Sequence, residues 1–200
     1  MKALLISDVE CRALWDYYQP DRVSGIDLII SCGDLKREYL EFLVTMTNKP
    51  VLFIPGNHDT GYVTNPPEGC ENIDDTVFVF RGVRFIGFGG CKKYHEGPYQ
   101  YTERDMEKRI RRARRQIRRA KGVDVVITHA APTGCGDRKD PAHLGFDCFR
   151  DLMDRYKPGY LIHGHVHMNY DSDISRTMQY GETTVVNAYE RYVLDLPDRE

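Results

Sequence analysis

Short apolar runs alternate with amphipathic stretches along this chain, and this alternation limits the fold more than any other feature of the sequence. Three apolar runs, over residues 2–7, 26–31 and 51–54, are typical of buried strands. The residues between them, 11–18 and 35–47, show helical patterns. The order strand, helix, strand, helix, strand predicts parallel strands joined by right-handed crossovers.

The pattern continues to the end of the chain. Two alternating runs within 76–90 flank Arg81-Gly82, which predicts a β-hairpin. The elements expected after it are a long helix over 102–122, strands over 123–128 and 159–165, a helix near 146–156 and closing antiparallel strands around Tyr180-Gly181. No linker of biased composition interrupts the 200 residues, so we expect one α/β domain over 1–200 with a mixed sheet system.

The composition is that of an ordinary globular protein. Hydrophobic residues make up 41% and charged residues 29%, and the net charge of −2 does not indicate a polyanion-binding protein as a whole. The six cysteines are far apart and form no C-x-x-C pair, which favours reduced thiols. The N-terminus does not resemble a signal peptide and no long apolar run occurs, so we expect a soluble cytoplasmic protein without a membrane partner. Nothing in the sequence indicates an oligomeric state.

Each predicted parallel strand is followed by polar side chains. The clusters are Asp8-Val9-Glu10, Gly33-Asp34, Gly56-Asn57-His58-Asp59, Thr128-His129 and His163-Gly164-His165-Val166-His167. Ligands bind outside the carboxyl ends of strands in open α/β sheets, so we expect these clusters to meet on one rim. Carboxylates, amide oxygens and imidazoles bind divalent transition metals. A single Gly-Asp is not evidence of a metal site, but five clusters in this order indicate one.

These clusters resemble the motifs of the calcineurin-like metallophosphoesterases. The family pattern is D-x-H, then G-D, then G-N-H-[DE], then a histidine after a strand, then G-H-x-H, and the resemblance covers residues 1 to about 168. It implies a two-sheet mixed β sandwich flanked by helices. It also implies two divalent metal ions at the strand ends and a phosphate ester as substrate.

The resemblance implies a role for each matching residue. The metal ligands would be Asp34, shared by both ions, with Asp8, Glu10 and His167 at one site and Asn57, His129 and His165 at the other. His58 would be the catalytic histidine that binds no metal, oriented by Asp59. His163 has the same parity in the extended chain as His165 but lies deeper in the strand, so we expect it to be a packed structural histidine.

Glu10 departs from the family pattern, which has histidine at this position. In one interpretation Glu10 ligates the metal as a carboxylate, which favours manganese, iron or magnesium over zinc. In the other it misses the metal, and the first site is weak or empty. We favour ligation, because a glutamate beside Asp8 and Asp34 would be costly without a cation. The expected cofactor is two divalent ions, manganese or iron first, with nickel, magnesium and zinc as alternatives.

The expected chemistry is hydrolysis of a phosphate ester. Two cations about 3.5–4 Å apart generate hydroxide from a shared water near neutral pH, and the hydroxide attacks phosphorus in line. His58 would protonate the leaving oxygen as general acid. We expect phosphodiesters rather than small monoesters as substrates. A catalytically silent interaction module and a metal sensor are the alternatives.

Two loops beside the predicted site are each open to two interpretations. Residues 131–146 and 89–101 contain cationic and aromatic side chains, and each loop either meets the substrate or is an ordinary solvated surface. His95 and His143 are not expected to be metal ligands.

The stretch 102–121 is the most basic in the chain. Ten Lys and Arg against three acidic residues give it a net charge of +7. Thr102 and Asp105 are typical of a capping box, and Gly122 of a helix stop. A narrow apolar stripe runs along it through Met106, Ile110, Ala113, Ile117 and Ala120. The helix is either a solvated helix packed on the sheet or a surface for nucleic acid, in which case the enzyme would be a nuclease.

Overall fold

The first apolar runs of the chain form a mixed sheet whose strands are mostly parallel. The computed structural model describes residues 1–169 and 175–198. In the first sheet the order is β13-β1-β2-β3-β4, with β1 to β4 parallel and β13 antiparallel to β1. The strands are β1 (Lys2–Ser7), β2 (Leu28–Ser31), β3 (Val51–Phe53), β4 (Glu71–Asn72) and β13 (Glu190–Asp195).

A second mixed sheet has the order β11-β12-β10-β9-β6-β5. Its strands are β5 (Val77–Phe80), β6 (Val83–Phe88), β9 (Val125–Thr128), β10 (Tyr160–His163), β11 (Thr177–Tyr180) and β12 (Thr183–Asn187). The four central strands are parallel, and antiparallel hairpins close both edges. A small ribbon of β7 (Cys91–Lys92) and β8 (Gln100–Tyr101) follows β6. The predicted hairpin at Arg81-Gly82 is confirmed, with positive φ at both residues.

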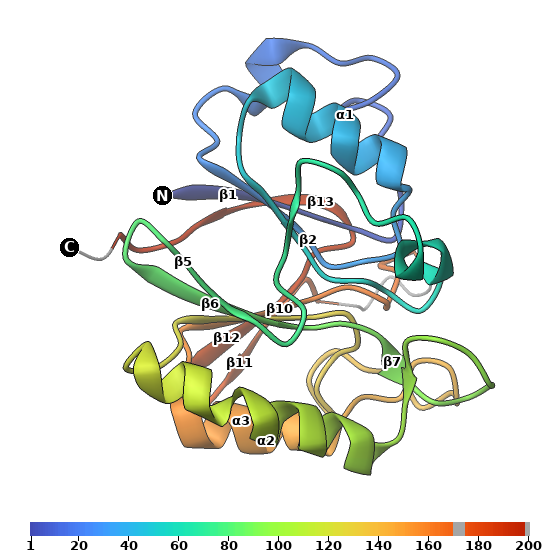
Figure 1. Cartoon of the computed structure of the whole chain (residues 1–200), viewed down its shortest axis with the longest axis vertical. Coiled ribbons are helices and arrows are strands. Elements are labelled where there is room, and N and C mark those ends of the chain that lie inside the picture. Colours follow the sequence, from blue (N-terminus) through green and yellow to red (C-terminus); the bar gives the residue numbers. More distant parts are fainter. Residues whose placement is uncertain (170–174, 199–200) are drawn as a thin grey trace.

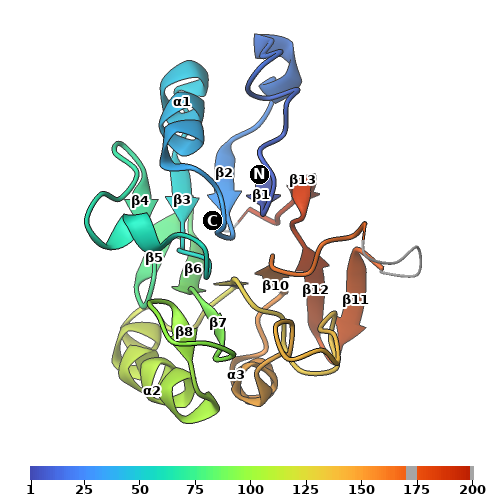
Figure 2. The ribbon, with the colours of Figure 1, turned by 90° about the vertical axis from the view of Figure 1, so that its right-hand side faces the viewer.

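The two sheets pack face to face and helices cover their outer faces (Figure 1). The helices are α1 (Arg37–Thr47), α2 (Glu103–Arg119) and α3 (Asp147–Tyr156), with short 3-10 turns η1 (Pro20–Val23) and η2 (Thr60–Val63). Figure 2 looks along the sandwich and shows α1 beyond the first sheet and α2 and α3 beyond the second. The expected two-sheet mixed sandwich flanked by helices is therefore confirmed.

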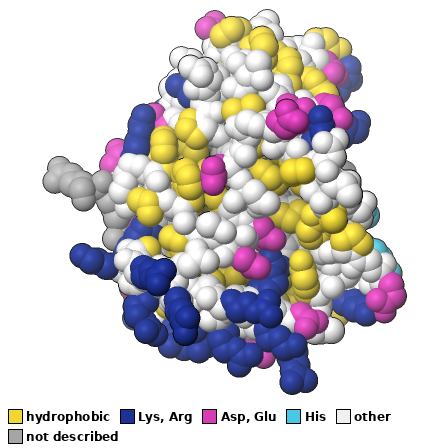
Figure 3. Space-filling view, viewed as in Figure 1, with side chains coloured by type: hydrophobic (Ala, Val, Ile, Leu, Met, Phe, Trp, Pro, Cys, Tyr) yellow, Lys and Arg dark blue, Asp and Glu magenta, His cyan; other side chains and the backbone are white. Residues whose placement is uncertain are grey.

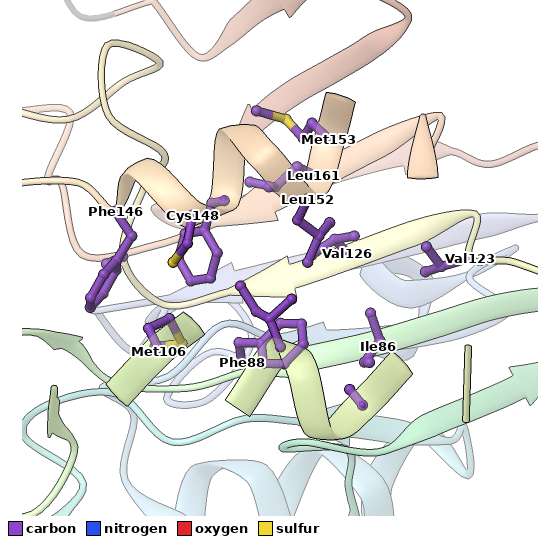
Figure 4. Close-up of a cluster of buried hydrophobic side chains, with 14 of the residues drawn as sticks. Ile86, Phe88, Met106, Val123, Val126, Phe146, Cys148, Leu152, Met153 and Leu161 are labelled. Carbon is purple, nitrogen blue, oxygen red and sulfur yellow. The ribbon is translucent and has the colours of Figure 1, made fainter. Parts of the chain in front are cut away.

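Three apolar clusters hold the layers together. The central cluster fills the space between the sheets and includes Leu5, Ile30, Phe85, Ile127 and Ile162. A second lies between the first sheet and α1. The third lies between the second sheet and the helices α2 and α3, where the side chains drawn in Figure 4 point toward one another from β6, β9 and β10 on one side and both helices on the other.

One prediction about the elements is wrong. Residues 11–18 form hydrogen-bonded turns rather than a helix. The segment is too short to offset the cost of helix nucleation and is rich in aromatic residues, and Pro20 follows closely. The closing strands expected around Tyr180-Gly181 are antiparallel, since β11 pairs with β12 in the second sheet and the last strand, β13, pairs with β1 in the first.

The basic helix α2 packs on the second sheet as an amphipathic helix. Thr102 and Asp105 form the predicted capping box. The apolar stripe is buried from Met106 to Ile117, while Ala120 is half-buried. One arginine shares this buried face, because Arg109 is only 6% exposed.

Arg109 ties α2 to the loops that precede β5 and follow β6. Its guanidinium lies 2.6 Å from Asp74 and 3.0 Å from Asp75, and it donates to the Gly89 carbonyl at 2.7 Å. The guanidinium also stacks over the Tyr101 ring at 4.4 Å. Burial raises the pKa of Asp74, and the charge of Arg109 opposes that effect. The ion pair therefore compensates the charge of a carboxylate that the fold removes from water.

We expect Arg109→Met to lower the free energy of unfolding by about 3 kcal/mol, because it leaves the largely buried Asp74 carboxylate without its counter-ion. Urea unfolding followed by circular dichroism measures the change. Arg112→Met is the matched control on the same helix; Arg112 is exposed, and its loss should change stability by less than about 0.5 kcal/mol. Equal effects of the two substitutions would contradict a structural role for Arg109.

Candidate metal centre

Strand ends of both sheets meet at one edge of the sandwich, the right-hand side in Figure 1. The Asp8 amide donates to the Gly33 carbonyl at 3.1 Å, which joins the ends of β1 and β2. The Asp8 carboxylate accepts from the His165 amide at 3.0 Å, which joins the first sheet to the second. The Gly164 amide donates to the His129 carbonyl at 3.0 Å. Backbone hydrogen bonds thus bring the predicted polar clusters to one rim.

Asp34, His129 and His165 form a compact group of potential metal ligands. One donor atom from each lies within 4.8 Å of the others. Both histidines are buried, and their rings lie 4.8 Å apart. Each ring has one nitrogen occupied by a backbone carbonyl, because His129 Nδ1 donates to Cys32 and His165 Nε2 donates to Ala142, both at 2.7 Å. Such bonds fix the orientation of a ligating imidazole and leave its other nitrogen for a metal.

The second ring nitrogen of His129 faces two oxygen atoms. His129 Nε2 lies 2.9 Å from Asn57 Oδ1 and 3.3 Å from Asp34 Oδ2. Burial alone would lower the pKa of His129, but Asp34, Asp8 and the Cys32 carbonyl together outweigh burial and raise this pKa to about 9. Three electron-rich atoms that converge in this way need a positive charge between them, which a proton or a divalent cation supplies. The donor set therefore fits a metal ion.

Asp8 and His167 lie beside this group. His167 Nε2 is 3.9 Å from Asp8 Oδ1, and Asp8 is almost fully buried. Burial and, to a smaller extent, the neighbouring Asp34 raise the pKa of Asp8, His129 opposes them, and the resulting pKa is about 6. A second cation next to Asp8 would stabilise this carboxylate in its charged form.

Three residues of the rim have left-handed backbones. Asp8, Asp34 and His165 have φ values of +67°, +57° and +67°. Such conformations cost about 1 kcal/mol or more for residues other than glycine and persist where the surroundings impose them. Their concentration at one rim, at the ends of three different strands, is typical of a functional site.

His58 is exposed beside Asp34, whereas Asp59 is buried beneath it. The His58 amide donates to Asp34 Oδ1 at 2.7 Å. The Asp59 carboxylate accepts from the amides of Asp34 and Gly56, both at 2.7 Å. Asp59 thus holds the two loops together, and its expected role of orienting the His58 imidazole stays a prediction.

Glu10 lies at the border of the site. Its Oε1 atom accepts from the Lys36 amide at 3.0 Å, at the start of α1. Glu10 lines a pocket of about 380 Å³ together with Asp34, His58 and Asp59. Ligation by Glu10 stays a prediction.

The histidines surround a cavity of about 410 Å³. It is lined by Asp8, Asp34, His58, Tyr94, Ala142, His143, His165 and His167. Each of the two loops with open interpretations contributes a side chain: Tyr94 comes from 89–101 and His143 from 131–146. The Tyr94 hydroxyl accepts from Asn57 Nδ2 at 3.3 Å, and His143 Nδ1 lies 2.7 Å from Asp140. The sequence contains both loops but has no periodicity or spacing that singles out these two side chains.

His163 lies behind the rim, as expected of a packed histidine. It is buried in β10, and its Nδ1 donates to the Gly164 carbonyl at 2.9 Å. Burial lowers its pKa to about 4, so the ring is neutral at physiological pH.

Comparison with known proteins agrees with this geometry. A model of the calcineurin-like phosphoesterase family matches residues 1–169. The chain belongs to this family. The resemblance of the sequence motifs is therefore confirmed over most of the chain, and membership implies a metal-dependent phosphoester hydrolase.

Two further proteins are similar to this calcineurin-like phosphoesterase. It is 24% identical to the UPF0046 protein K07C11.7 of Caenorhabditis elegans over 216 residues, which cover 94% of this chain and 69% of the relative. Its fold is similar to the crystal structure of TT1561 of Thermus thermophilus, with a TM-score of 0.63 and 16% identity, over 94% of this chain and 89% of that one. Among the described residues of the phosphoesterase, no helix is long and apolar enough to cross a membrane.

We expect Gly56→Ala to weaken metal binding by the phosphoesterase at least tenfold. A Cβ atom at Gly56 would overlap the Asp34 carboxylate and its amide, so Asp34 would have to move. Titration calorimetry with Mn²⁺ measures the affinity. Gly61→Ala is the control in the following turn, where a Cβ would meet no atom within 4 Å. An unchanged affinity in a folded Gly56→Ala protein would show that Asp34 is not needed for the metal.

Proposed function

We propose that this protein is a dinuclear metal-dependent phosphodiesterase. The observation that carries the proposal is the convergence of His129 Nε2, Asn57 Oδ1 and Asp34 Oδ2 at the strand ends, in a member of a phosphoesterase family. In the proposed arrangement Asp34 holds both metal ions. Asn57, His129 and His165 complete one metal site, and Asp8, Glu10 and His167 complete the other.

Glu10 can act as a ligand while keeping its hydrogen bond. Oε1 is engaged by the Lys36 amide, and a carboxylate has a second oxygen that can bind a cation. A carboxylate at this position makes the first site richer in oxygen, which favours manganese or iron over zinc. We therefore propose manganese or iron as the metal.

The side chains around the cavity have separate tasks in the proposed reaction. Metal ions held by these residues would supply a water of lowered pKa and would neutralise the phosphate oxygens. His58 binds no metal, borders the cavity and is exposed, so it can reach the leaving oxygen of a bound ester and give it a proton. The hydrogen bond from the His58 amide to Asp34 keeps the imidazole next to the proposed metal site.

A diester suits the two spaces that Asp34 and His58 share. These residues line both the cavity of about 410 Å³ and the pocket of about 380 Å³ that contains Glu10. A phosphate at the metal pair could place one ester substituent in each. A monoester would use only one of the two spaces.

Comparing substrates tests the role of His58. The substrates are bis-p-nitrophenyl phosphate, p-nitrophenyl phosphate and a thymidine dinucleotide, assayed with manganese, iron, nickel, magnesium or zinc added to metal-stripped protein. We expect His58→Ala to slow cleavage of the dinucleotide by about 10²–10⁴, because its alkoxide needs a proton, and to affect the nitrophenyl esters much less. The control His95→Ala removes an exposed histidine outside the cavity and should leave all rates unchanged.

Asp34→Ala should abolish metal-dependent turnover of all three substrates. If the folded wild-type protein cleaves none of them with any metal, the phosphodiesterase proposal is wrong. The protein would then be the silent interaction module, or a metal sensor if it binds metal without turnover.

We expect Glu10→His to change the ratio of zinc to manganese affinity by about tenfold in favour of zinc, which corresponds to about 1.4 kcal/mol. Calorimetric titrations with the two metals measure the ratio. Glu38→His is the control, because Glu38 lines the same pocket and is exposed at the start of α1. If Glu10→His alters neither affinity, metal preference nor rate, Glu10 is not a ligand.

A nuclease is the sub-case of a phosphodiesterase that the basic helix favours. The substrate of a nuclease is a polyanion, and the stretch that contains α2 is the most basic in the chain. Binding of nucleic acid by α2 does not by itself require that the metal centre cleaves it.

A further inference from the structure

α2 and the residue pair after it carry a dense set of exposed cations. Of the ten Lys and Arg between 104 and 121, Arg109 is buried against acidic residues and Lys108 lies 3.4 Å from Asp105. The other eight are exposed, and within the part of the chain that the structure describes none of them makes an ion pair or a side-chain hydrogen bond. This arginine face consists of Arg104, Arg111, Arg112, Arg114, Arg115, Arg118, Arg119 and Lys121.

Pairing is common for arginine elsewhere in the chain. Arg12, Arg81 and Arg84 each form an ion pair with an aspartate. The chain has 30 acidic residues and a net charge of −2, so acidic partners are not scarce. Eight like charges along α2 and the two residues after it instead repel one another, and an anion bound across them would relieve that repulsion.

The arginine face points away from the metal centre. In Figure 3 the Lys and Arg atoms gather along the lower edge of the molecule, over α2, whereas the histidine atoms appear at the right-hand edge. A helix of 17 residues is about 25 Å long, and α2 begins beside the β7–β8 ribbon near the metal centre. Its most basic part, Arg111–Lys121, is the distant end.

A pocket at this distant end has a purely basic charged lining. It measures about 260 Å³ and lies between α2 and α3. Its charged lining residues are Arg114, Arg118, Lys121 and Arg155, without a carboxylate. The larger neighbouring pocket between the two helices contains three carboxylates and three arginines, so it suits an anion less.

The surroundings favour the phosphates of a nucleic acid over a lipid surface. An amphipathic helix that binds membranes inserts apolar side chains, but the apolar stripe of α2 is buried in the core from Met106 to Ile117. A protein partner would need an apolar centre to its interface, and none of the exposed large apolar side chains lies on α2 or α3. Seven of the eight cations are arginine, whose planar guanidinium binds phosphate through paired hydrogen bonds.

We propose that the arginine face, together with Arg155 of α3, binds the phosphate backbone of a nucleic acid at a site separate from the metal centre. The contacts are to phosphates, and α2 offers no aromatic side chain for base stacking, so binding is independent of base sequence. The site holds the nucleic acid whether or not the metal centre cleaves it.

Fluorescence anisotropy with a labelled 20-nucleotide single-stranded DNA tests the proposal. EDTA is present, so that hydrolysis and metal binding play no part. We expect the wild-type protein to bind with micromolar affinity at low salt, with a log–log salt dependence set by the number of phosphate contacts. The variant Arg114→Gln/Arg118→Gln/Lys121→Gln should bind at least tenfold more weakly, and its salt slope should be shallower by about 2.

The control variant carries the same loss of charge away from α2. Arg12→Gln/Arg22→Gln/Arg191→Gln removes three exposed arginines on the side of the first sheet, and its affinity should stay within about twofold of wild type. Thermal unfolding of both variants verifies that they are folded. The proposal is overturned if the wild-type protein does not bind the DNA, if both variants weaken binding equally, or if phosphatidylserine vesicles bind the arginine face and DNA does not.

Discussion

The Asp34 carboxylate is the point on which the metal centre depends. Its two oxygens face different partners, because Oδ1 accepts from the His58 amide and Oδ2 faces His129 across the sandwich. Its own amide donates to Asp59. The ends of β2, β3 and β9 are thus held by one residue, whose left-handed backbone is imposed by these contacts. A change in any of the three loops reaches the metal centre through Asp34.

The electrostatics of the rim favour the binding of a cation. Burial raises the pKa of Asp8 to about 6 and that of Asp59 to about 7, while Asp34, together with Asp8 and the Cys32 carbonyl, raises that of His129 to about 9. The two carboxylates resist ionisation and the imidazole retains its proton. Both effects indicate a site with an excess of electron-rich atoms. Divalent ions bound to the proposed ligands would compensate this excess.

Patterns local in the sequence predicted most of the sandwich and most of the rim. The strand ends were predictable because a short apolar run followed by a polar cluster has few other interpretations. Residues 11–18 were not, since a helical periodicity over so few residues does not show whether packing can offset the cost of nucleation. The crossing of β13 and the approach of Tyr94 and His143 to the cavity depend on contacts distant in the sequence, which no local spacing records.

The chain separates its charges between two surfaces with different demands. At the rim, carboxylates and imidazoles are buried and held by backbone amides and carbonyls, so that their positions are fixed before a cation binds. On α2 the arginines of the arginine face are exposed, while Arg109 turns inward and anchors the helix. A fixed array suits small ions with a strict geometry, whereas long mobile side chains suit a flexible polyanion whose phosphates can be met in many registers. The different burial of the two sets of charges thus follows from the different ligands that each can hold.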